Sequence, residues 1–280
     1  MMAKDEQDSA TVMTANIKLS GPDWELQTKM SVPQGATHVR QLLPGAQAFA
    51  DAVVGAAINV AESRGEKISC KKGCGACCRQ LVPIAETEAR HIRDVIEALP
   101  EPRRGEIRSR FAEARHRLET VGLLEKLQRP SRQWEAGESI SFGLQYFAQG
   151  IPCPFLEDGA CSIYADRPIA CREYLVTSPA ENCTQPTAQT VRCVPLPLKV
   201  WTALARFDKV PPPERFIRWV PLILAPEWAE SHPDNMAASP GPELLREFLG
   251  HVSRTGKALA EPEYLPLDQV SSAALLEEKS

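Results

Sequence analysis

The sequence lacks most of the motifs by which enzymes are recognised. It contains no phosphate-binding loop, no GxGxxG, no GxSxG and no HExxH. The five histidines, at positions 38, 91, 116, 232 and 251, are scattered, and none has the spacing of paired metal ligands. These absences argue against nucleotide binding, serine hydrolysis and histidine-based zinc chemistry, so the function must be sought in another residue type.

The sequence also lacks a charge excess and a long uninterrupted apolar run. The formal net charge is −4, and no basic patch alternates with aromatic residues. Asp51 interrupts the apolar stretch 48–61 and Arg218 interrupts 216–225, so neither reaches the roughly 20 residues of a membrane span. The N-terminal residues show no apolar signal-peptide core. We therefore expect a cytoplasmic protein that binds neither nucleic acid nor a membrane.

Cysteine is the residue that the sequence concentrates. Four of the nine cysteines lie in the stretch Cys70-Lys-Lys-Gly-Cys74-Gly-Ala-Cys77-Cys78. The cytosol keeps thiols reduced, and a disulfide between the adjacent Cys77 and Cys78 would be strained, so metal or redox chemistry is the better interpretation. Glycines at positions 73 and 75 permit a tight turn with close backbone approach to an ion or cluster.

A second set of five cysteines lies between residues 153 and 193. We interpret Cys193 as a small apolar side chain. The other eight thiolates suffice for two four-thiolate sites or for one cluster with additional ligands, and the count does not choose between zinc, iron and an iron–sulfur cluster. The predicted metal ligands are Cys70, Cys74, Cys77, Cys78, Cys153, Cys161, Cys171 and Cys183. Nearby cations would stabilise the thiolates, and we expect them from Lys71, Lys72, Arg79, Arg167 and Arg172.

These motifs carry a family resemblance. The segments are Cys74-Gly-Ala-Cys77-Cys78, Cys153-Pro-Phe-Leu, Gly159-Ala-Cys161-Ser-Ile-Tyr164, Arg167-Pro168 and Cys171-Arg172-Glu-Tyr174. Together they resemble the YkgJ-type cysteine-cluster family, a zinc- or iron-chelating domain with the shorthand CxxCxxCC, over roughly residues 68–185. The first gap here holds three residues where the shorthand has two. The resemblance implies metal ligation by Cys70, Cys74, Cys77, Cys78, Cys153, Cys161 and Cys171, with zinc, iron or a [4Fe-4S] cluster as cofactor.

Two functions follow from this resemblance and from the thiolate count. The first is a metal-binding protein with a structural, carrier or maturation role. The alternative is an iron–sulfur-dependent enzyme like the protein lysine N-methylases, because relatives of the family include flagellin lysine N-methylase; S-adenosylmethionine would be a cofactor only in that case. In either case a protein partner or substrate is expected, and the sequence does not identify it.

A third reading is a radical S-adenosylmethionine enzyme. Cys70, Cys74 and Cys77 have the spacing which that class uses for its cluster. Ala76, however, stands where an aromatic residue often precedes the last cysteine, and the chain lacks the alternating strand and helix pattern of a barrel. We therefore do not favour it.

The hydrophobic periodicity predicts a mainly α protein with a loop-rich cysteine lobe and a small N-terminal β-hairpin. The hairpin is expected within 15–33, with its turn at Gly21–Asp23, after a disordered start at 1–13. Helices are expected at 41–63, 86–99, 103–128, 139–148, 197–207, 214–229 and 241–257. We expect the helices at 41–63 and 86–128 to pack together and hold the cysteine loop from both sides.

This pattern suggests a division of the chain into four parts. Residues 1–35 form the disordered start and the hairpin, 36–193 the cysteine-cluster domain, 194–260 a helical extension and 261–280 a mobile tail. Within the cysteine lobe we expect one short strand pair and a turn of helix after Pro168.

Overall fold

The structure is a computed structural model that describes residues 11–128, 138–187, 189–207 and 218–258. In these residues helices dominate and every sheet is a two-stranded antiparallel pair. This confirms the predicted mainly α class with minor β structure. The described strands form no parallel barrel, so the fold gives no support to a radical S-adenosylmethionine enzyme.

The N-terminal hairpin is present as expected. Strand β1 (Val12–Ser20) pairs with β2 (Glu25–Pro33) around a turn at Gly21–Trp24, where the Gly21 N–H donates to the Trp24 carbonyl at 2.8 Å. The first strand begins at Val12, so the expectation of disorder up to residue 13 is wrong there, because Met13 packs against the core and fixes the strand end. Residues 1–10 lie outside the described residues.

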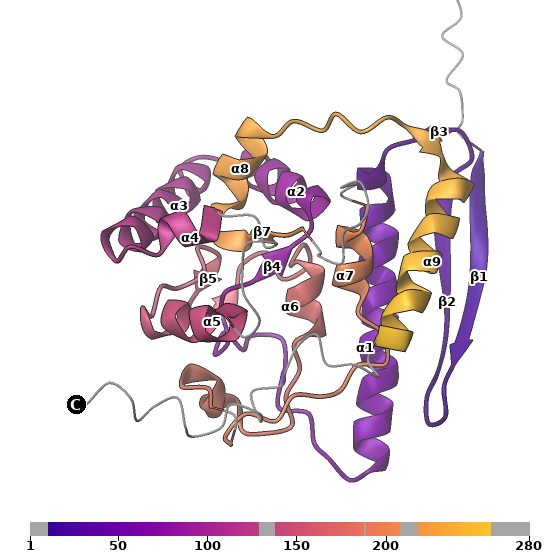
Figure 1. The fold of residues 1–280 in the computed structure, drawn as a ribbon, viewed down its shortest axis with the longest axis horizontal. Helices are drawn as coiled ribbons and strands as arrows, with labels where there is room; N and C mark the ends of the chain where they lie inside the picture. Colours follow the sequence, from indigo (N-terminus) through magenta and orange to yellow (C-terminus); the bar gives the residue numbers. More distant parts are fainter. Residues whose placement is uncertain (1–10, 129–137, 188, 208–217, 259–280) are drawn as a thin grey trace, which may run out of the picture.

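Helix α1 (Leu43–Ser63) is the central element of the fold and follows a short 3₁₀ turn, η1 (Val39–Leu42). Pro44 occupies its first turn, and Gly65, with φ of 78°, follows its end, as the sequence indicates. Its side chains at Ala46, Phe49, Ala50 and Val53 are completely buried. Figure 1 shows α1 lying beside helix α9 (Gly241–Ala258) and the hairpin, and the Phe49 and Phe248 rings meet edge to face at 5.9 Å.

The stretch Val39–Ser63 is long and apolar enough to cross a membrane by length and composition. Asp51 therefore does not disqualify this helix, contrary to the expectation from the sequence. Its surroundings nevertheless explain its apolar character, because α1 packs against β2, α6 (Ile169–Glu173) and α7 (Val200–Ala205) inside the fold. This packing favours a core helix over a membrane span.

A second group of helices lies across the molecule from the hairpin (Figure 1). Helix α2 (Glu86–Glu97) packs against α8 (Ala225–Ser231) and α3 (Arg103–Thr120). The predicted helix at 103–128 is interrupted at Gly122, whose φ of 72° favours glycine, and resumes as α4 (Leu124–Gln128). The expected packing of the helices at 41–63 and 86–128 is confirmed only at one end, where α2 contacts η1. Along its length α1 packs against α6 instead, and the buried residues of α1 and α2 belong to different apolar clusters.

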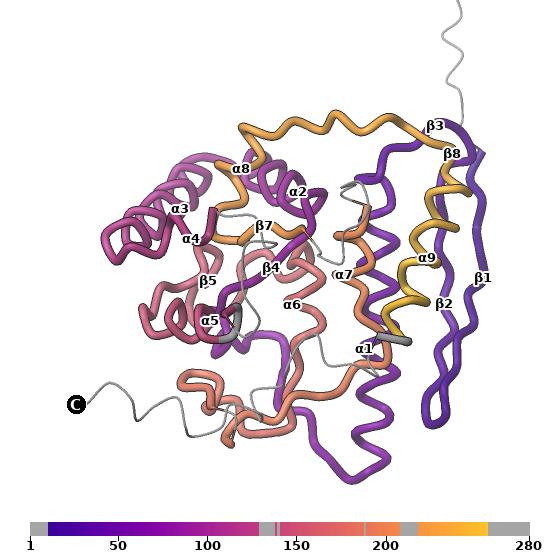
Figure 2. Tube along the Cα trace, in the orientation of Figure 1, coloured from indigo at the N-terminus to yellow at the C-terminus, as the bar shows by residue number. Residues whose placement is uncertain are grey.

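The remaining elements connect these two halves, and their course can be followed in Figure 2. Residues 220–231 do not form one helix. Here β7 (Val220–Pro221) pairs with β4 (Pro83–Ile84), and η4 (Leu222–Leu224) and α8 follow. The part of the predicted helix at 214–217 lies outside the described residues. The other elements are β3 (Ala36–Thr37), β8 (Ser239–Pro240), α5 (Glu138–Ala148), β5 (Leu156–Glu157), β6 (Ala160–Cys161) and η3 (Ala180–Thr184). The division of the chain at residues 36, 194 and 261 stays a prediction.

Candidate metal centre

The first cysteine set lies on the loop between α1 and α2. Two tight turns shape it: the Cys74 N–H donates to the Lys71 carbonyl at 3.1 Å, and the Cys78 N–H donates to the Gly75 carbonyl at 3.0 Å. Gly73 lies in the left-handed region at φ of 90°, which explains the glycine at this position. All four cysteines of the loop are reduced and half-buried.

The second set lies on an irregular segment with little regular structure. Cys161 ends the short β5–β6 hairpin, whose two-residue turn is Asp158-Gly159 with both φ angles positive. Cys171 lies on the single turn of helix α6, which begins after Pro168. The predicted short strand pair and the predicted turn of helix are therefore both present.

Two close backbone contacts join the two sets. The Cys153 N–H donates to the Cys78 carbonyl at 2.8 Å. Gly75 faces the β5–β6 turn so closely that an added Cβ would lie 2.5 Å from the Gly159 carbonyl oxygen and 2.4 Å from Leu156 Cδ1. Glycine is required at position 75 to let the two segments meet, a different role from the close approach to an ion that the sequence suggested.

A buried carboxyl group fixes the helix that carries Cys171. Glu88 accepts a hydrogen bond from the Ile169 N–H at 2.7 Å through Oε1 and another from the Ala85 N–H at 3.0 Å through Oε2. Burial raises the pKa of Glu88 to about 7, and only the two backbone donors and the charge of Arg172 oppose this rise. One side chain thus ties the start of α2 to the start of α6.

Arg172 has a bracing role that the sequence did not reveal. Its Nη1 donates to Asp51 on α1 at 2.8 Å, its Nε donates to the Arg167 carbonyl at 3.0 Å, and Nη2 donates to the Ala165 carbonyl. The guanidinium is therefore committed to α1 and to the chain before α6. We had expected Arg172 to serve as a cation for the thiolates, and its contacts assign it to the scaffold instead.

The Cys77 thiol interacts electrostatically with cysteines of both sets. It shares a side-chain hydrogen bond with Cys78, and this bond, followed by burial, strongly raises its pKa. A negative charge on Cys77 would raise the pKa of five other cysteines, which come from both sets: Cys70, Cys153, Cys161, Cys171 and Cys183. No other cysteine is coupled to so many thiols among the shifts that the structure shows.

Burial, the largest cause, also keeps most of these thiols neutral. It raises the pKa of Cys153 to about 12 and that of Cys183 to about 11, and it raises the pKa of Cys70, Cys161 and Cys171 as well. Desolvated thiols of this kind become good ligands only when a cation replaces their protons. The donor chemistry therefore suits a soft metal ion or cluster.

Arg167 supplies a second observation that fits a thiolate centre. Its guanidinium stacks on the Tyr164 ring at 4.0 Å, and its Nε is buried with no hydrogen-bond partner among the described residues. The same positive charge lowers the pKa of Cys70, Cys77 and Cys161. A buried guanidinium N–H without an acceptor is costly, and a metal–thiolate group with net negative charge beside it would compensate this cost.

The described side chains do not yet form a complete coordination sphere. Within residues 11–128, 138–187, 189–207 and 218–258, no three His, Cys, Asp or Glu side chains converge closely enough to hold one ion together. The predicted ligand set therefore stays a prediction, although the fold brings most of its members into one region. Cys183 is buried beside Val176 and Val191, and Cys70 and Cys77 pack against the same three residues.

Sequence reasoning missed two residues beside this region. The Tyr174 side chain forms a hydrogen bond with Gln80 of the first loop, and burial strongly raises the pKa of Tyr174. Cys193 is exposed, so its interpretation as a small apolar side chain of the core is wrong. Its backbone pairs with Val176, and it lies within electrostatic range of Tyr174 and Cys183. The Cys171-Arg172-Glu-Tyr174 motif was a signal for Tyr174, whereas nothing in the sequence distinguished Cys193.

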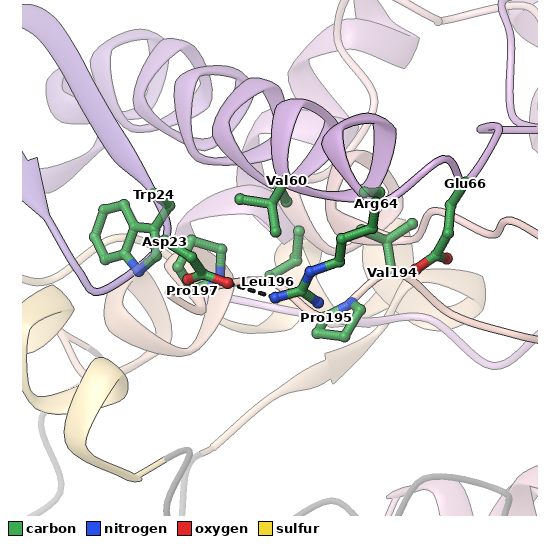
Figure 3. Close-up of a pocket in the computed structure, with 11 residues that line it drawn as sticks. Asp23, Trp24, Val60, Arg64, Glu66, Val194, Pro195, Leu196 and Pro197 are labelled. Atoms are coloured by element: carbon green, nitrogen blue, oxygen red, sulfur yellow. Dashed lines mark hydrogen bonds and ion pairs between the residues drawn. The ribbon is translucent and has the colours of Figure 1, made fainter.

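A surface cavity of about 170 Å³ lies at the edge of the cysteine lobe, where the hairpin turn meets the end of α1 (Figure 3). Trp24, Arg64 and Leu196 are among its lining residues, and Arg64 forms an ion pair with Asp23 across it. No cysteine lines this cavity. Cys70 nevertheless packs against the apolar cluster to which Val194 and Leu196 of the lining belong, so the cavity adjoins the thiol region.

The fold and the site define a mainly helical protein with an irregular, thiol-rich lobe suited to soft metal ions. Residues 69–194 match the sequence model of the CxxCxxCC family, described as a "putative zinc- or iron-chelating domain". This segment is thus similar to that family, which confirms the resemblance seen in the sequence and supports metal binding at that level. Neither a curated protein nor a solved structure matches the chain.

Proposed function

We propose that this protein holds zinc, iron or an iron–sulfur cluster, [4Fe-4S] included, through thiolates from both cysteine sets. The observation that carries the proposal is the position of Cys77. Its thiol is an electrostatic neighbour of cysteines from both sets, and the adjacent Cys78 carbonyl accepts a hydrogen bond from Cys153. The family match supports metal binding in general, while the choice of metal and ligands belongs to this proposal.

The contacts suggest how the ligands divide. Cys153, Cys161 and Cys171 are mutual electrostatic neighbours and share Cys77. Cys70 has Cys77 and Cys74 as neighbours, and Cys183 has Cys77 and Cys70. We infer one group formed by Cys153, Cys161 and Cys171 and a second formed by Cys70, Cys74 and Cys183. The pair Cys77–Cys78 stands between the two groups and supplies the remaining thiolates of either one shared site or two.

A metal at this place would stabilise the least regular part of the chain. When bound, the metal or cluster supplies strong bonds to soft ligands, and those bonds would add to the limited apolar packing of the segment around Cys77. Arg167 would lie beside the thiolates and offset their negative charge, with Tyr164 holding its guanidinium plane. A structural, carrier or maturation role in the cytoplasm agrees with this arrangement, and we propose no nucleic-acid or membrane partner.

Anaerobic purification followed by elemental analysis, acid-labile sulfide determination and a visible absorption spectrum tests this proposal. Iron with equimolar sulfide and a broad absorption band in the blue part of the visible spectrum would indicate an iron–sulfur cluster. Stoichiometric zinc in a colourless protein would indicate a zinc site. A protein that is correctly folded, yet binds neither metal after reconstitution under reducing conditions, would contradict the proposal.

The ligand set is tested with serine variants and a matched control. Cys77→Ser removes the thiol between the two groups, so we expect loss of most of the bound metal. Cys193→Ser changes an exposed cysteine outside the proposed set, and we expect it to retain full metal content. Full metal content and full stability in Cys77→Ser would show that the ligand assignment is wrong at its centre.

The methylase alternative rests on family resemblance alone. It requires turnover of S-adenosylmethionine, whereas a structural or carrier role predicts none. Methyl transfer to a lysine-containing protein by the metal-loaded chain, and its loss in Cys77→Ser, would establish the enzyme.

A further inference from the structure

The outer edge of strand β1 is an unusually long open strand edge. β1 spans nine residues, and within the part of the chain that the structure describes it pairs with β2 alone. Among the described residues, no backbone hydrogen bond reaches its other side. Figure 1 shows β1 as the outermost element beside β2, with α9 on the inner side of the hairpin. Unpaired strand edges are templates for pairing with another chain.

The hydrogen bonds at the two ends of the hairpin show which backbone groups point outward. The Gly21 N–H donates to the Trp24 carbonyl, and the Gln34 N–H donates to the Thr11 carbonyl, both at 2.8 Å. Inward and outward residues alternate along an antiparallel strand, so odd-numbered residues of β1 face β2. The outward N–H and C=O groups therefore belong to Val12, Thr14, Asn16, Lys18 and Ser20.

The edge carries few of the features by which natural proteins block pairing. β1 contains no proline and a single charged residue, Lys18, whereas blocked edges use prolines, bulges or several charges. The pairing with β2 is continuous from Val12↔Pro33 to Ser20↔Glu25, without a bulge. On the core side, Met13, Ala15 and Leu19 are only partly covered.

We propose that two copies of this chain pair through their β1 strands into a four-stranded antiparallel sheet, with Asn16 opposite Asn16 on the twofold axis. This register sets outward-facing residues opposite each other along the whole strand: Val12 faces Ser20, and Thr14 faces Lys18. It would form roughly ten backbone hydrogen bonds. The strand is self-complementary in charge, because its one cation, Lys18, faces a neutral Thr14 of the second copy.

The packing inside each copy leaves room for this arrangement. The main contacts of α1 and α9 with the hairpin are to β2 rather than β1. A twofold axis through Asn16, perpendicular to the sheet, keeps both sets of helices on one face and places them over the outer β2 strands. The two central β1 strands would then bring the partly covered Met13, Ala15 and Leu19 of both copies together, which reduces their contact with water.

Sedimentation velocity of the full-length chain across a concentration series tests the proposal. We expect a monomer–dimer equilibrium. Asn16→Pro removes the central outward donor and leaves the inward bonds of the odd-numbered residues, so we expect a monomer. Lys29→Pro is the matched control, because it makes the same change on β2 opposite Asn16, away from the β1 edge, and should remain dimeric. Circular dichroism checks that both variants are folded.

Charge variants at Thr14 test the register without disturbing the backbone. Thr14→Glu would face Lys18 of the second copy twice in the dimer, and we expect the dimer dissociation constant to fall by about 2- to 30-fold. Thr14→Lys would face the same Lys18 and should raise it by a similar factor. Added salt should reduce both effects.

A strictly monomeric chain at all concentrations would overturn the proposal, as would a dimer that neither Asn16→Pro nor the charge variants change. A chain that stays monomeric but binds an extended peptide at this edge would replace the second copy with another occupant, and would equally overturn it. Metal content is independent of all these variants, so failure here leaves the proposed metal centre untouched.

Discussion

The half of the molecule that contains the hairpin, α1, α7 and α9 differs from the cysteine lobe in what holds it together. In the first, one apolar cluster joins all four elements and includes the fully buried rings of Phe49, Phe207 and Phe248. In the second, the cluster beside Cys77 contains only three buried residues, Val176, Cys183 and Val191. The rest of the lobe is held by backbone hydrogen bonds, by close turns and by single buried side chains such as Phe155 and Ile163, which pack into the apolar cluster of α2 and α3.

This difference gives a physical reason for the metal that we propose in the lobe. Burial of apolar surface contributes roughly 25 cal/mol per Å², so the α1 half can be stable from packing alone. The lobe buries the Cys183 thiol and charged groups such as Arg172 and Glu173. Metal–thiolate bonds give such a segment the stability that apolar packing does not supply.

Metal removal is expected to have the largest effect and to affect the two halves unequally. Structural zinc contributes about 10–16 kcal/mol to small thiolate domains, so its loss should unfold the lobe at residues 69–79 and 151–194. The α1 half should keep its slow amide exchange, because its apolar cluster contains no cysteine. Hydrogen exchange with and without a chelator measures this, and equal loss of protection in both halves would refute the comparison.

Phe49→Ala is the complementary change in the apolar half. Phe49 is completely buried and meets Phe248 at 5.9 Å, so its removal leaves a large cavity and should cost about 3–5 kcal/mol of unfolding free energy. Urea unfolding measures the loss. Metal content per folded chain should not change, and a parallel loss of metal would show that the two halves are not separable in this way.

Glu88 ties the start of α2 to helix α6 of the cysteine lobe and should give a pH-dependent stability. Its pKa rises from the ordinary 4.5 to about 7, a difference of 2.5 units or about 3 kcal/mol. Below pH 4.5 the group is protonated in both states and its stabilising contribution is fully present. Between pH 4.5 and 7 only the folded protein holds the proton, so stability falls as the pH rises through about 7.

Glu88→Gln removes this titration. The destabilisation of the variant relative to the wild type should therefore be larger at pH 5 than at pH 8, when urea unfolding of both proteins is compared at matched metal content. Glu173, whose pKa burial also raises to about 7, titrates in both proteins and cancels in the difference. A difference that does not vary with pH would show that Glu88 is ionised throughout.

The smallest expected effect comes from a single methyl group at the joint between the two cysteine sets. Gly75→Ala places a Cβ 2.5 Å from the Gly159 carbonyl oxygen, which forces the backbone segments apart and should cost about 1–3 kcal/mol. Gly55→Ala in α1 is the control, because nothing lies within 4 Å of its added Cβ and alanine favours a helix. Thermal unfolding and metal content measure both, and indistinguishable variants would contradict the proposed joint.

Much of the fold follows from local signals that a single sequence contains. Helices α1, α2 and α9 and the hairpin were predicted because their apolar residues repeat at helical or strand spacing and because proline and glycine mark their ends. The interruption at Gly122 and the short elements at 220–231 were missed. Their causes are a glycine conformation and the pairing of β7 with β4, and a periodic pattern contains neither.

The sequence by itself determined the chemistry of the site: nine thiols in two sets, a family of metal-chelating domains, and the mainly helical scaffold around them. The tertiary structure decided how the parts meet. It placed Gly75 against Gly159, Arg167 near the thiols of Cys70 and Cys77, and Arg172 against Asp51. It also set α6 beside α1. The physical reason is range: side-chain type and periodicity act over a few residues, whereas these contacts join residues about 80 to 120 positions apart and exist only once the chain has packed.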